Sequence, residues 1–145
     1  MRIKEVLASK PTHDVVTVGP HATVRELLGL LAEHNIGALV VSTDGTTVEG
    51  IVSERDVVRR LHADESVLDS SVSSIMSSPV HTCGTDATVN ELMEVMTERR
   101  FRHVPVVVDG RLLGIMSIGD VVKSRMSELQ FERDQLDSYV HSSQT

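Results

Sequence analysis

The sequence predicts a mixed α/β (α+β) fold built from two similar halves, and three observations support this prediction. First, TVRELLGLLAEHNIGALVVSTDGTTVEGIVSERDVV, which begins at Thr23, aligns with TVNELMEVMTERRFRHVPVVVDGRLLGIMSIGDVV from Thr88. Second, each copy holds two stretches whose apolar residues recur at helical spacing. Third, each copy holds two short runs rich in β-branched residues, which favour strands. A repeat of this kind indicates a pseudo-symmetric pair of small units.

The first helix of each copy is expected to begin at a capping box. Thr23 and Glu26 form the pattern Thr-x-x-Glu in the first copy, and Thr88 and Glu91 form it in the second. In such a box the two side chains satisfy backbone N–H groups that the helix leaves unpaired. The apolar residues that follow at helical spacing are Val24, Leu27, Leu28 and Leu31 in the first copy, and Val89, Leu92, Met93 and Met96 in the second.

Two strands and a second helix complete each copy. The runs ALVVS and VPVVV predict strands, and Asp44-Gly45 or Asp109-Gly110 after each run predicts a hairpin. GIVSERDVV from Gly50 and GIMSIGDVV from Gly114 then turn the second strand into a helix. Each unit is therefore β-α-β-β-α, with a first strand at VVTV or VHTC. A unit of about 50 residues is too small to bury its own sheet, so we expect each unit to cover the other's apolar face.

The C-terminal tail departs from the repeat. We divide the chain into a first unit with an N-terminal lead-in helix (1–65), a second unit (66–125) and a helical tail (126–145). Steps of four and three residues separate the members of an apolar stripe, which are Val122, Met126, Leu129, Leu136 and Val140, with Arg133 at the one interrupted position. This heptad-like spacing suits a helix packed on its own domain or a helix paired across a dimer, of which the second is narrowly favoured. The last residues, HSSQT, are expected to be frayed.

Composition excludes several classes of partner. The 145 residues carry a net charge of −7, and the only aromatic residues are Phe101, Phe131 and Tyr139. A nucleic-acid-binding protein needs a basic surface or aromatic stacking platforms, so we expect no nucleic-acid partner. No apolar run is long enough to span a bilayer, so we expect no membrane association and a cytoplasmic location.

The reactive side chains do not indicate an enzyme. Seven histidines show no metal-ligand spacing, and neither a Gly-x-Ser-x-Gly motif nor a P-loop occurs. Cys83 is the only cysteine, which excludes an intramolecular disulfide and fits a reducing compartment. We expect Cys83 to be a small buried residue in a strand rather than a reactive thiol. The sequence therefore predicts no catalytic residue and no metal site.

The repeated turn, with Ser53 and Asp56 in one copy and Ser117 and Asp120 in the other, allows two interpretations. Serine followed three residues later by an acid caps a helix, which stabilises it by about 1 kcal/mol. The same helix N-terminus suits a phosphate, and an aspartate one turn on can accept both hydroxyls of a ribose. In the second interpretation, the glycine that begins each turn lets a ligand approach the strand closely.

These features together resemble a cystathionine-β-synthase (CBS) domain pair, or Bateman module, of the stand-alone bacterial type. The resemblance runs from about Val6 to Arg125 and rests on tandem β-α-β-β-α units that each end in Gly-h-h-Ser-x-x-Asp, where h is apolar. It implies two units packed sheet to sheet, with clefts that bind adenosine-containing ligands such as AMP, ADP, ATP, NAD(H) or S-adenosylmethionine. It further implies a cytoplasmic energy or redox sensor without an obligatory cofactor, regulated by AMP or NAD(H). The expected assembly is a homodimer of CBS pairs that acts on an unknown downstream protein.

Carried over by motif, the predicted ligand-binding residues are Thr17, Ser53, Arg55, Asp56, Thr82, Arg102, His103, Pro105, Ser117 and Asp120. The resemblance assigns ribose to the aspartates, phosphate to the serines and the neighbourhood of the adenine base to the threonines. RHVPV, from Arg102, resembles a segment that brings a basic side chain to the phosphates. Arg55 has the same potential or is a solvated helix residue, and His103 is also explained as a surface residue.

The two copies differ at positions that matter for a charged ligand. Gly119 stands where the first copy has Arg55, and Gly37-Ala38 align with Arg102-His103. We therefore expect two clefts that differ in affinity or ligand. The alternative function is a ligand-free structural or adaptor dimer that recognises another protein, in which the Ser-x-x-Asp turns are helix caps only.

Overall fold

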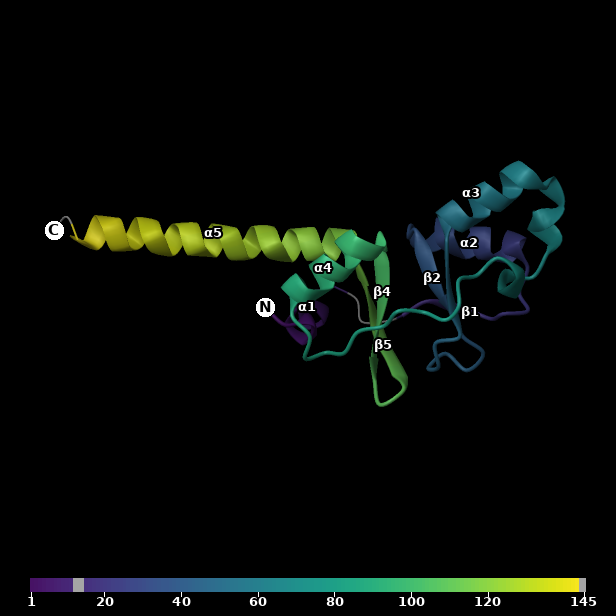
Figure 1. Ribbon diagram of the computed structural model, residues 1–145, viewed down its shortest axis with the longest axis horizontal. Helices are drawn as coiled ribbons and strands as arrows, with labels where there is room; N and C mark the ends of the chain where they lie inside the picture. The colour runs from purple at the N-terminus through teal and green to yellow at the C-terminus, as the bar shows by residue number, and fades with distance from the viewer. Residues whose placement is uncertain (12–14, 144–145) are drawn as a thin grey trace. The chain divides into compact units, whose positions relative to one another are not determined.

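A computed structural model describes residues 1–11 and 15–143, and it confirms the mixed α+β fold with a C-terminal helix. The elements in chain order are α1 (Ile3–Ser9), β1 (Thr17–Val18), α2 (Val24–His34), β2 (Ala38–Val41), β3 (Gly50–Ser53), α3 (Glu54–Ala63), the 3-10 helices η1 (Glu65–Asp69) and η2 (Val72–Ser74), α4 (Val89–Arg99), β4 (His103–Val108), β5 (Arg111–Ser117) and α5 (Ile118–Ser143) (Figure 1). The second copy departs from the predicted pattern, because its first strand is reduced to an isolated bridge between Cys83 and Val106.

The residues cluster into two compact units that do not follow the order of the repeats. One unit, the helical unit, holds 1–13, 84–103 and 116–145, and the other, the sheet unit, holds 14–83 and 104–115. The sequence-based division at 1–65, 66–125 and 126–145 stays a prediction.

The sheet unit is built around β2. Strand β1 pairs with it in parallel, with Thr17 opposite Val40, and β3 pairs antiparallel, with Ala38 opposite Ser53 and Val41 opposite Gly50. All four residues of β2 are buried, as expected for the central strand of a covered sheet. The core is aliphatic and consists of Val18, Val24, Leu27, Leu31, Leu39, Val41, Val52, Val57, Val67, Val72 and Ile75.

The segment that precedes the second copy returns to the first copy within the sheet unit. The Val72 amide donates to the Ala22 carbonyl at 2.8 Å, and Ser77 exchanges two backbone hydrogen bonds with Ile51. A Cβ on Gly50 would lie 2.5 Å from Met76 Sδ and 3.1 Å from the Ser77 carbonyl oxygen. The expectation that Gly50 makes room for a ligand is therefore wrong, because the protein's own chain fills that space.

The helical unit shows the reciprocal arrangement. The Ile3 amide donates to the Ala87 carbonyl at 2.9 Å, and the Val89 amide donates to the Met1 carbonyl at 2.9 Å. These bonds attach α1, which precedes the first copy, to the start of α4 in the second copy. The side chains of Ile3 and Val6 on α1 are buried. Each copy therefore receives the lead-in segment of the other.

The predicted capping boxes are present, and so is the turn at Asp109-Gly110. In the first copy, Asp44-Gly45 does not form a tight turn but lies in the longer loop 42–49 between β2 and β3. Thr23 with Glu26 and Thr88 with Glu91 make both hydrogen bonds of the box at the starts of α2 and α4. Strands β4 and β5 join through Asp109 (φ 53°) and Gly110 (φ 76°). A positive φ at both central residues is the requirement of the type I′ turn, which explains the Asp-Gly pair.

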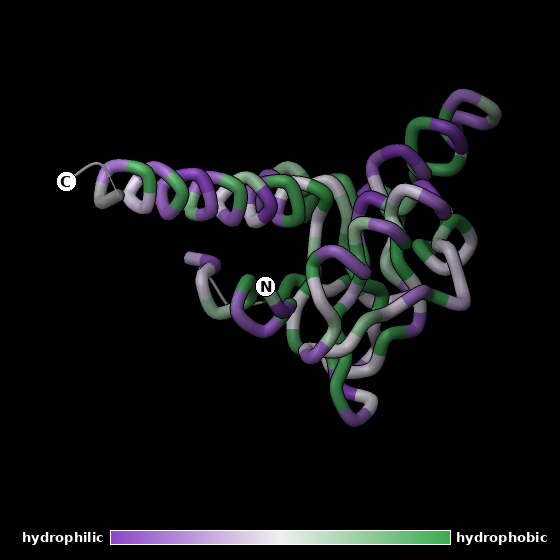
Figure 2. The backbone as a smooth tube through the Cα atoms, turned by 60° about the vertical axis from the view of Figure 1, so that its left-hand side comes forward, coloured by the Kyte–Doolittle hydropathy of each residue, from purple (hydrophilic) through white to green (hydrophobic). Residues whose placement is uncertain are grey.

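Helix α5 runs without a break from Ile118 to Ser143. Its first half is anchored, since Val121 and Ser124 are buried, but every residue from Leu129 to His141 is exposed. Figure 2 shows apolar and polar residues alternating along this helix. The expectation of fraying at HSSQT is wrong for 141–143, which continue the helix, and 144–145 lie outside the described residues.

Candidate functional site

The first Ser-x-x-Asp turn forms a closed hydrogen-bonded ring at the start of α3. The Ser53 backbone N–H donates to Asp56 Oδ2 at 2.8 Å, and the Ser53 hydroxyl donates to the same oxygen at 3.1 Å. The Asp56 backbone N–H donates to Ser53 Oγ at 3.3 Å. Ser53 is extended, with φ −122° and ψ 164°, as an N-cap must be for β3 to pass directly into α3. The capping interpretation of this turn is thus confirmed.

The second turn repeats this geometry at the start of α5 and adds a cation. The Ser117 backbone N–H donates to Asp120 Oδ2 at 2.9 Å, and the Asp120 N–H donates to Ser117 Oγ at 3.1 Å. The ammonium group of Lys10 lies 2.9 Å from the same Oδ2 atom. Lys10 directly follows α1, so the lead-in segment of the first copy supplies the cation that neutralises the acid of the second.

The environment lowers the pKa of Asp120 below its ordinary value. Burial raises this pKa, but the hydrogen bond from the Ser117 backbone, the hydrogen bond from Lys10 and the charge of Lys10 together outweigh it. The carboxylate is therefore ionised over the whole neutral range. An ionised carboxylate accepts hydrogen bonds and donates none, which is the property that a pair of ribose hydroxyls requires.

Each turn combines three groups that a nucleotide can use. The helix that follows begins with backbone N–H groups and a partial positive charge, which attract a phosphate. The serine hydroxyl lies at the same helix end. Among the described residues, the hydrogen bonds to both aspartates fall on Oδ2, which leaves Oδ1 as an acceptor for a ligand.

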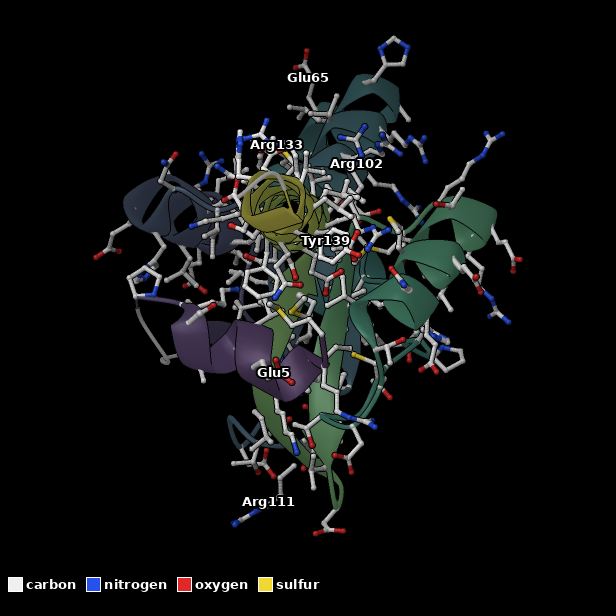
Figure 3. All side chains as sticks on the ribbon, turned by 90° about the vertical axis from the view of Figure 1, so that its left-hand side faces the viewer. Glu5, Glu65, Arg102, Arg111, Arg133 and Tyr139 are labelled. Atoms are coloured by element: carbon white, nitrogen blue, oxygen red, sulfur yellow. The ribbon has the colours of Figure 1, made fainter. Side chains whose placement is uncertain are left out.

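Backbone hydrogen bonds place Arg102 and Gly37 at equivalent points of the two copies. The Ile118 amide at the start of α5 donates to the Arg102 carbonyl at 2.8 Å, and the Glu54 amide at the start of α3 donates to the Gly37 carbonyl at 2.9 Å. The structure thus brings Arg102 next to the second turn, where its side chain is exposed (Figure 3). The first copy has no side chain at the matching position, because that residue is glycine.

The other predicted site residues are distributed over both units. In the sheet unit, Thr17 is half-buried in β1, Arg55 is exposed on α3 and Pro105 is buried in β4. Thr82 is exposed and does not lie in a strand, which corrects the prediction of a matched strand around it. In the helical unit, His103 begins β4 and is half-buried.

Lys10 is the residue that the sequence analysis missed. It is separated from Asp120 by 110 positions, so no local pattern joins the two. A signal was nonetheless present, because Lys10-Pro11 aligns with Ser78-Pro79 ahead of the second copy. A departure from the repeat at one position of an otherwise matched lead-in marks a place where the copies differ in charge.

The histidines and Cys83 are the other reactive groups that the sequence singled out. The described part of the chain holds no cluster of three or more histidine, cysteine, aspartate or glutamate residues that suits a metal ion, although His13 lies outside that part. Burial raises the pKa of Cys83 to about 11. Cys83 is only half-buried and lies on an isolated bridge rather than in a strand, so the expected environment was partly wrong. No helix of the described residues has the length and hydrophobicity to cross a membrane.

The CBS domain family model matches residues 3–63 and 72–127. A CBS-domain containing protein from Agrobacterium tumefaciens has a TM-score of 0.82 and 47% sequence identity, with 86% of this chain and 99% of that chain covered. A CBS domain protein from Pyrobaculum aerophilum, complexed with AMP, has a TM-score of 0.72 and 32% identity over 83% of this chain and 89% of that chain.

A third similar structure also contains adenosine compounds. It is a CBS domain pair in complex with 5′-methylthioadenosine and S-adenosyl-L-methionine, with a TM-score of 0.76 and 25% identity over 88% of this chain and 98% of that chain. Two of the three similar structures therefore hold ligands that share an adenosine group.

Proposed function

This chain belongs to the CBS domain family, and from that premise we propose that it is a non-enzymatic regulatory module for an adenosine-containing ligand. The ligand class includes AMP, ADP, ATP and NAD(H), and the module acts as a cytoplasmic sensor of energy or redox state. AMP in one similar structure and 5′-methylthioadenosine with S-adenosyl-L-methionine in another support the class of ligand. We further propose that the protein works as a homodimer and reports ligand binding to a downstream protein.

The observation that carries the proposal is the pair of Ser-x-x-Asp turns, each at a helix N-terminus. In each turn, Asp56 or Asp120 keeps one carboxylate oxygen for the ribose hydroxyls while the other oxygen holds the turn together. Ser53 or Ser117, with the first amides of the helix, then receives a phosphate. In this assignment Thr17 and the exposed Thr82 lie near the base.

The two turns are expected to bind unequally. Asp120 has the cation Lys10 on its carboxylate and Arg102 beside its helix. Among the described residues, Ser53 is the one that donates hydrogen bonds to Asp56, and the residue equivalent to Arg102 is Gly37. Because phosphate affinity depends on nearby positive charge, ligands with different numbers of phosphates should distinguish the two turns.

Thermal unfolding in the presence of a panel of adenine nucleotides tests this function. A ligand that binds only the folded protein stabilises it by about 2.7 kcal/mol at a hundredfold excess over its dissociation constant. We expect at least one of AMP, ADP, ATP, NAD⁺ or NADH to raise the melting temperature by several degrees. GMP at the same concentration is the control for nonspecific phosphate binding.

A ligand-free adaptor is the competing function, and one observation favours it: both turns are helix caps closed by hydrogen bonds between their own residues. If no adenine nucleotide moves the melting curve and none is released from denatured protein, the sensor function is wrong and the adaptor stands. If binding occurs but persists in the double variant Asp56→Asn/Asp120→Asn, the module binds nucleotides through other residues.

A further inference from the structure

The apolar stripe of α5 lies on the surface of the helical unit. Val122, Met126, Leu129 and Leu136 expose 49%, 66%, 50% and 65% of their area, and Val140 continues the line. Large apolar side chains that are exposed together in a row mark an interaction surface, because leaving them in water is unfavourable. The reading in which the tail packs on its own domain is wrong beyond residue 128, since that part of α5 is exposed on all sides.

The first half of α5, which is anchored in the helical unit, provides a binding surface for another helix. Ile118, Val122 and Met126 line an open, mainly apolar groove, together with the long side chains of Lys123 and Gln130. The projecting half carries Leu136 and Val140 at matching spacing. Both halves of α5 thus carry exposed apolar residues of the same stripe.

We propose that α5 pairs antiparallel with α5 of a second copy of this chain, centred near residue 131. In this register Val122 meets the partner's Val140, Met126 meets the partner's Leu136, and Leu129 meets the partner's Arg133. Each contact occurs twice because the pairing is symmetric. Every position of the stripe is thereby used, from Val122 at one end to Val140 at the other. The inference does not depend on nucleotide binding.

The charges beside the stripe select the antiparallel direction. In the antiparallel register Lys123 lies beside the partner's Asp137, which gives two ion pairs of opposite charge per dimer. In a parallel pairing in register, Arg133 would face Arg133 once and Glu132 would face Asp137 twice, so the dimer would hold three contacts between like charges. Repulsion between like charges disfavours the parallel pairing, and attraction between opposite charges favours the antiparallel pairing.

The centre of the antiparallel pair also balances its charges. By its spacing Arg133 belongs to the stripe, and Figure 3, viewed along α5, shows Arg133 and Tyr139 on different sides of the helix. The aliphatic stem of Arg133 can cover the partner's Leu129 while its guanidinium group reaches the edge of the interface. The two Glu132 side chains meet there, and the two arginines neutralise them.

Cysteine cross-linking in full-length protein tests the direction of pairing. In a Cys83→Ser background, Met126→Cys/Leu136→Cys should give a covalent dimer with a short bismaleimide, because each introduced thiol faces the other position of the partner. Neither single variant should do so, since identical positions lie ten residues apart along the axis, or about 15 Å. Efficient cross-linking by both single variants would indicate parallel helices and overturn the proposal.

Sedimentation equilibrium tests the interface itself. Leu136→Asp should raise the dimer dissociation constant at least tenfold, whereas Gln135→Asp, one position along on the other face, should leave it unchanged. Lys123→Glu and Asp137→Lys should each weaken the dimer, and the double variant should regain most of the loss. Helix content by circular dichroism shows that each variant is folded. A monomeric wild-type protein, a dimer indifferent to Leu136→Asp, or a charge swap without recovery would each refute the pairing.

Discussion

At the scale of single residues, two aspartates with the same local partner sit in different electrostatic surroundings. Within the part of the chain that the structure describes, Asp56 is held by Ser53, whereas Asp120 is held by Ser117 and by Lys10 at 2.9 Å. Both carboxylates complete a helix cap, so both contribute to stability. Only the second also depends on a cation from a distant part of the chain, which makes its contribution sensitive to pH and to one substitution.

Lys10→Met should lower stability near neutral pH and lose this effect in acid. The folded-state pKa of Asp120 is depressed, so its contribution is present above the ordinary value of 3.8 and is lost as pH falls through the lower folded value. We expect a loss of about 0.5–1 kcal/mol at pH 7, because the pair is half-buried. Urea unfolding from pH 2 to 7 measures it. Lys4→Met removes the same charge from the exposed Lys4–Asp86 pair and should change little.

Cys83 should react slowly in the folded protein. Its pKa of about 11, against an ordinary 9.0, lowers the thiolate fraction at pH 8 by roughly two orders of magnitude. Iodoacetamide should therefore modify native Cys83 about 100-fold more slowly than the same residue in urea, as followed by mass spectrometry. Equal rates in the two states would show that burial does not protect the thiol.

At the scale of elements, the strand that begins the first turn depends on close backbone packing. Gly50 opens β3 and meets Met76 and the Ser77 carbonyl, while Ser77 and Ile51 exchange hydrogen bonds along the same line. This contact joins β3 to the segment that leads into the second copy. The absence of a side chain at Gly50 is therefore a packing requirement of the first turn.

Gly50→Ala and Gly29→Ala should act in opposite directions. The first substitution pushes Cβ against Met76 and the Ser77 oxygen, and we expect a loss of about 1–2 kcal/mol. The second lies inside α2 with no heavy atom within 4 Å, and alanine there should add about 0.5–1 kcal/mol. Urea unfolding of both variants measures the difference. A neutral Gly50→Ala would contradict the packing requirement at this position.

At the scale of the whole molecule, the features that could be predicted from the sequence are the local ones, which neighbouring residues determine. Capping boxes, the Asp109-Gly110 turn and the two strand-to-helix turns follow from residues within a few positions of each other, and all were found. The repeat itself identified the family. Those inferences needed no knowledge of how distant segments meet.

Long-range contacts escaped prediction for a physical reason. Lys10 with Asp120, and Met76 with Gly50, join segments whose approach is set by the exchange of lead-in segments between the copies. No local propensity encodes that exchange. The first strand of the second copy was overestimated, since VHTC has the composition of a strand but forms only one bridge, at Cys83. The sequence predicted a separate tail from residue 126, because the amphipathic pattern there differs from the repeat. In the structure α5 continues across this boundary without a break.

The central claim is that the two aspartates bind the ribose hydroxyls of an adenosine-containing ligand. Equilibrium binding of AMP and of 2′,3′-dideoxy-AMP to wild type and to Asp56→Asn/Asp120→Asn tests it most directly. We predict that wild type binds AMP at least tenfold more tightly than the dideoxy compound, and that the double variant binds both equally weakly. Equal affinity of wild type for the two compounds, or a preference for AMP that survives in the double variant, would contradict the assignment.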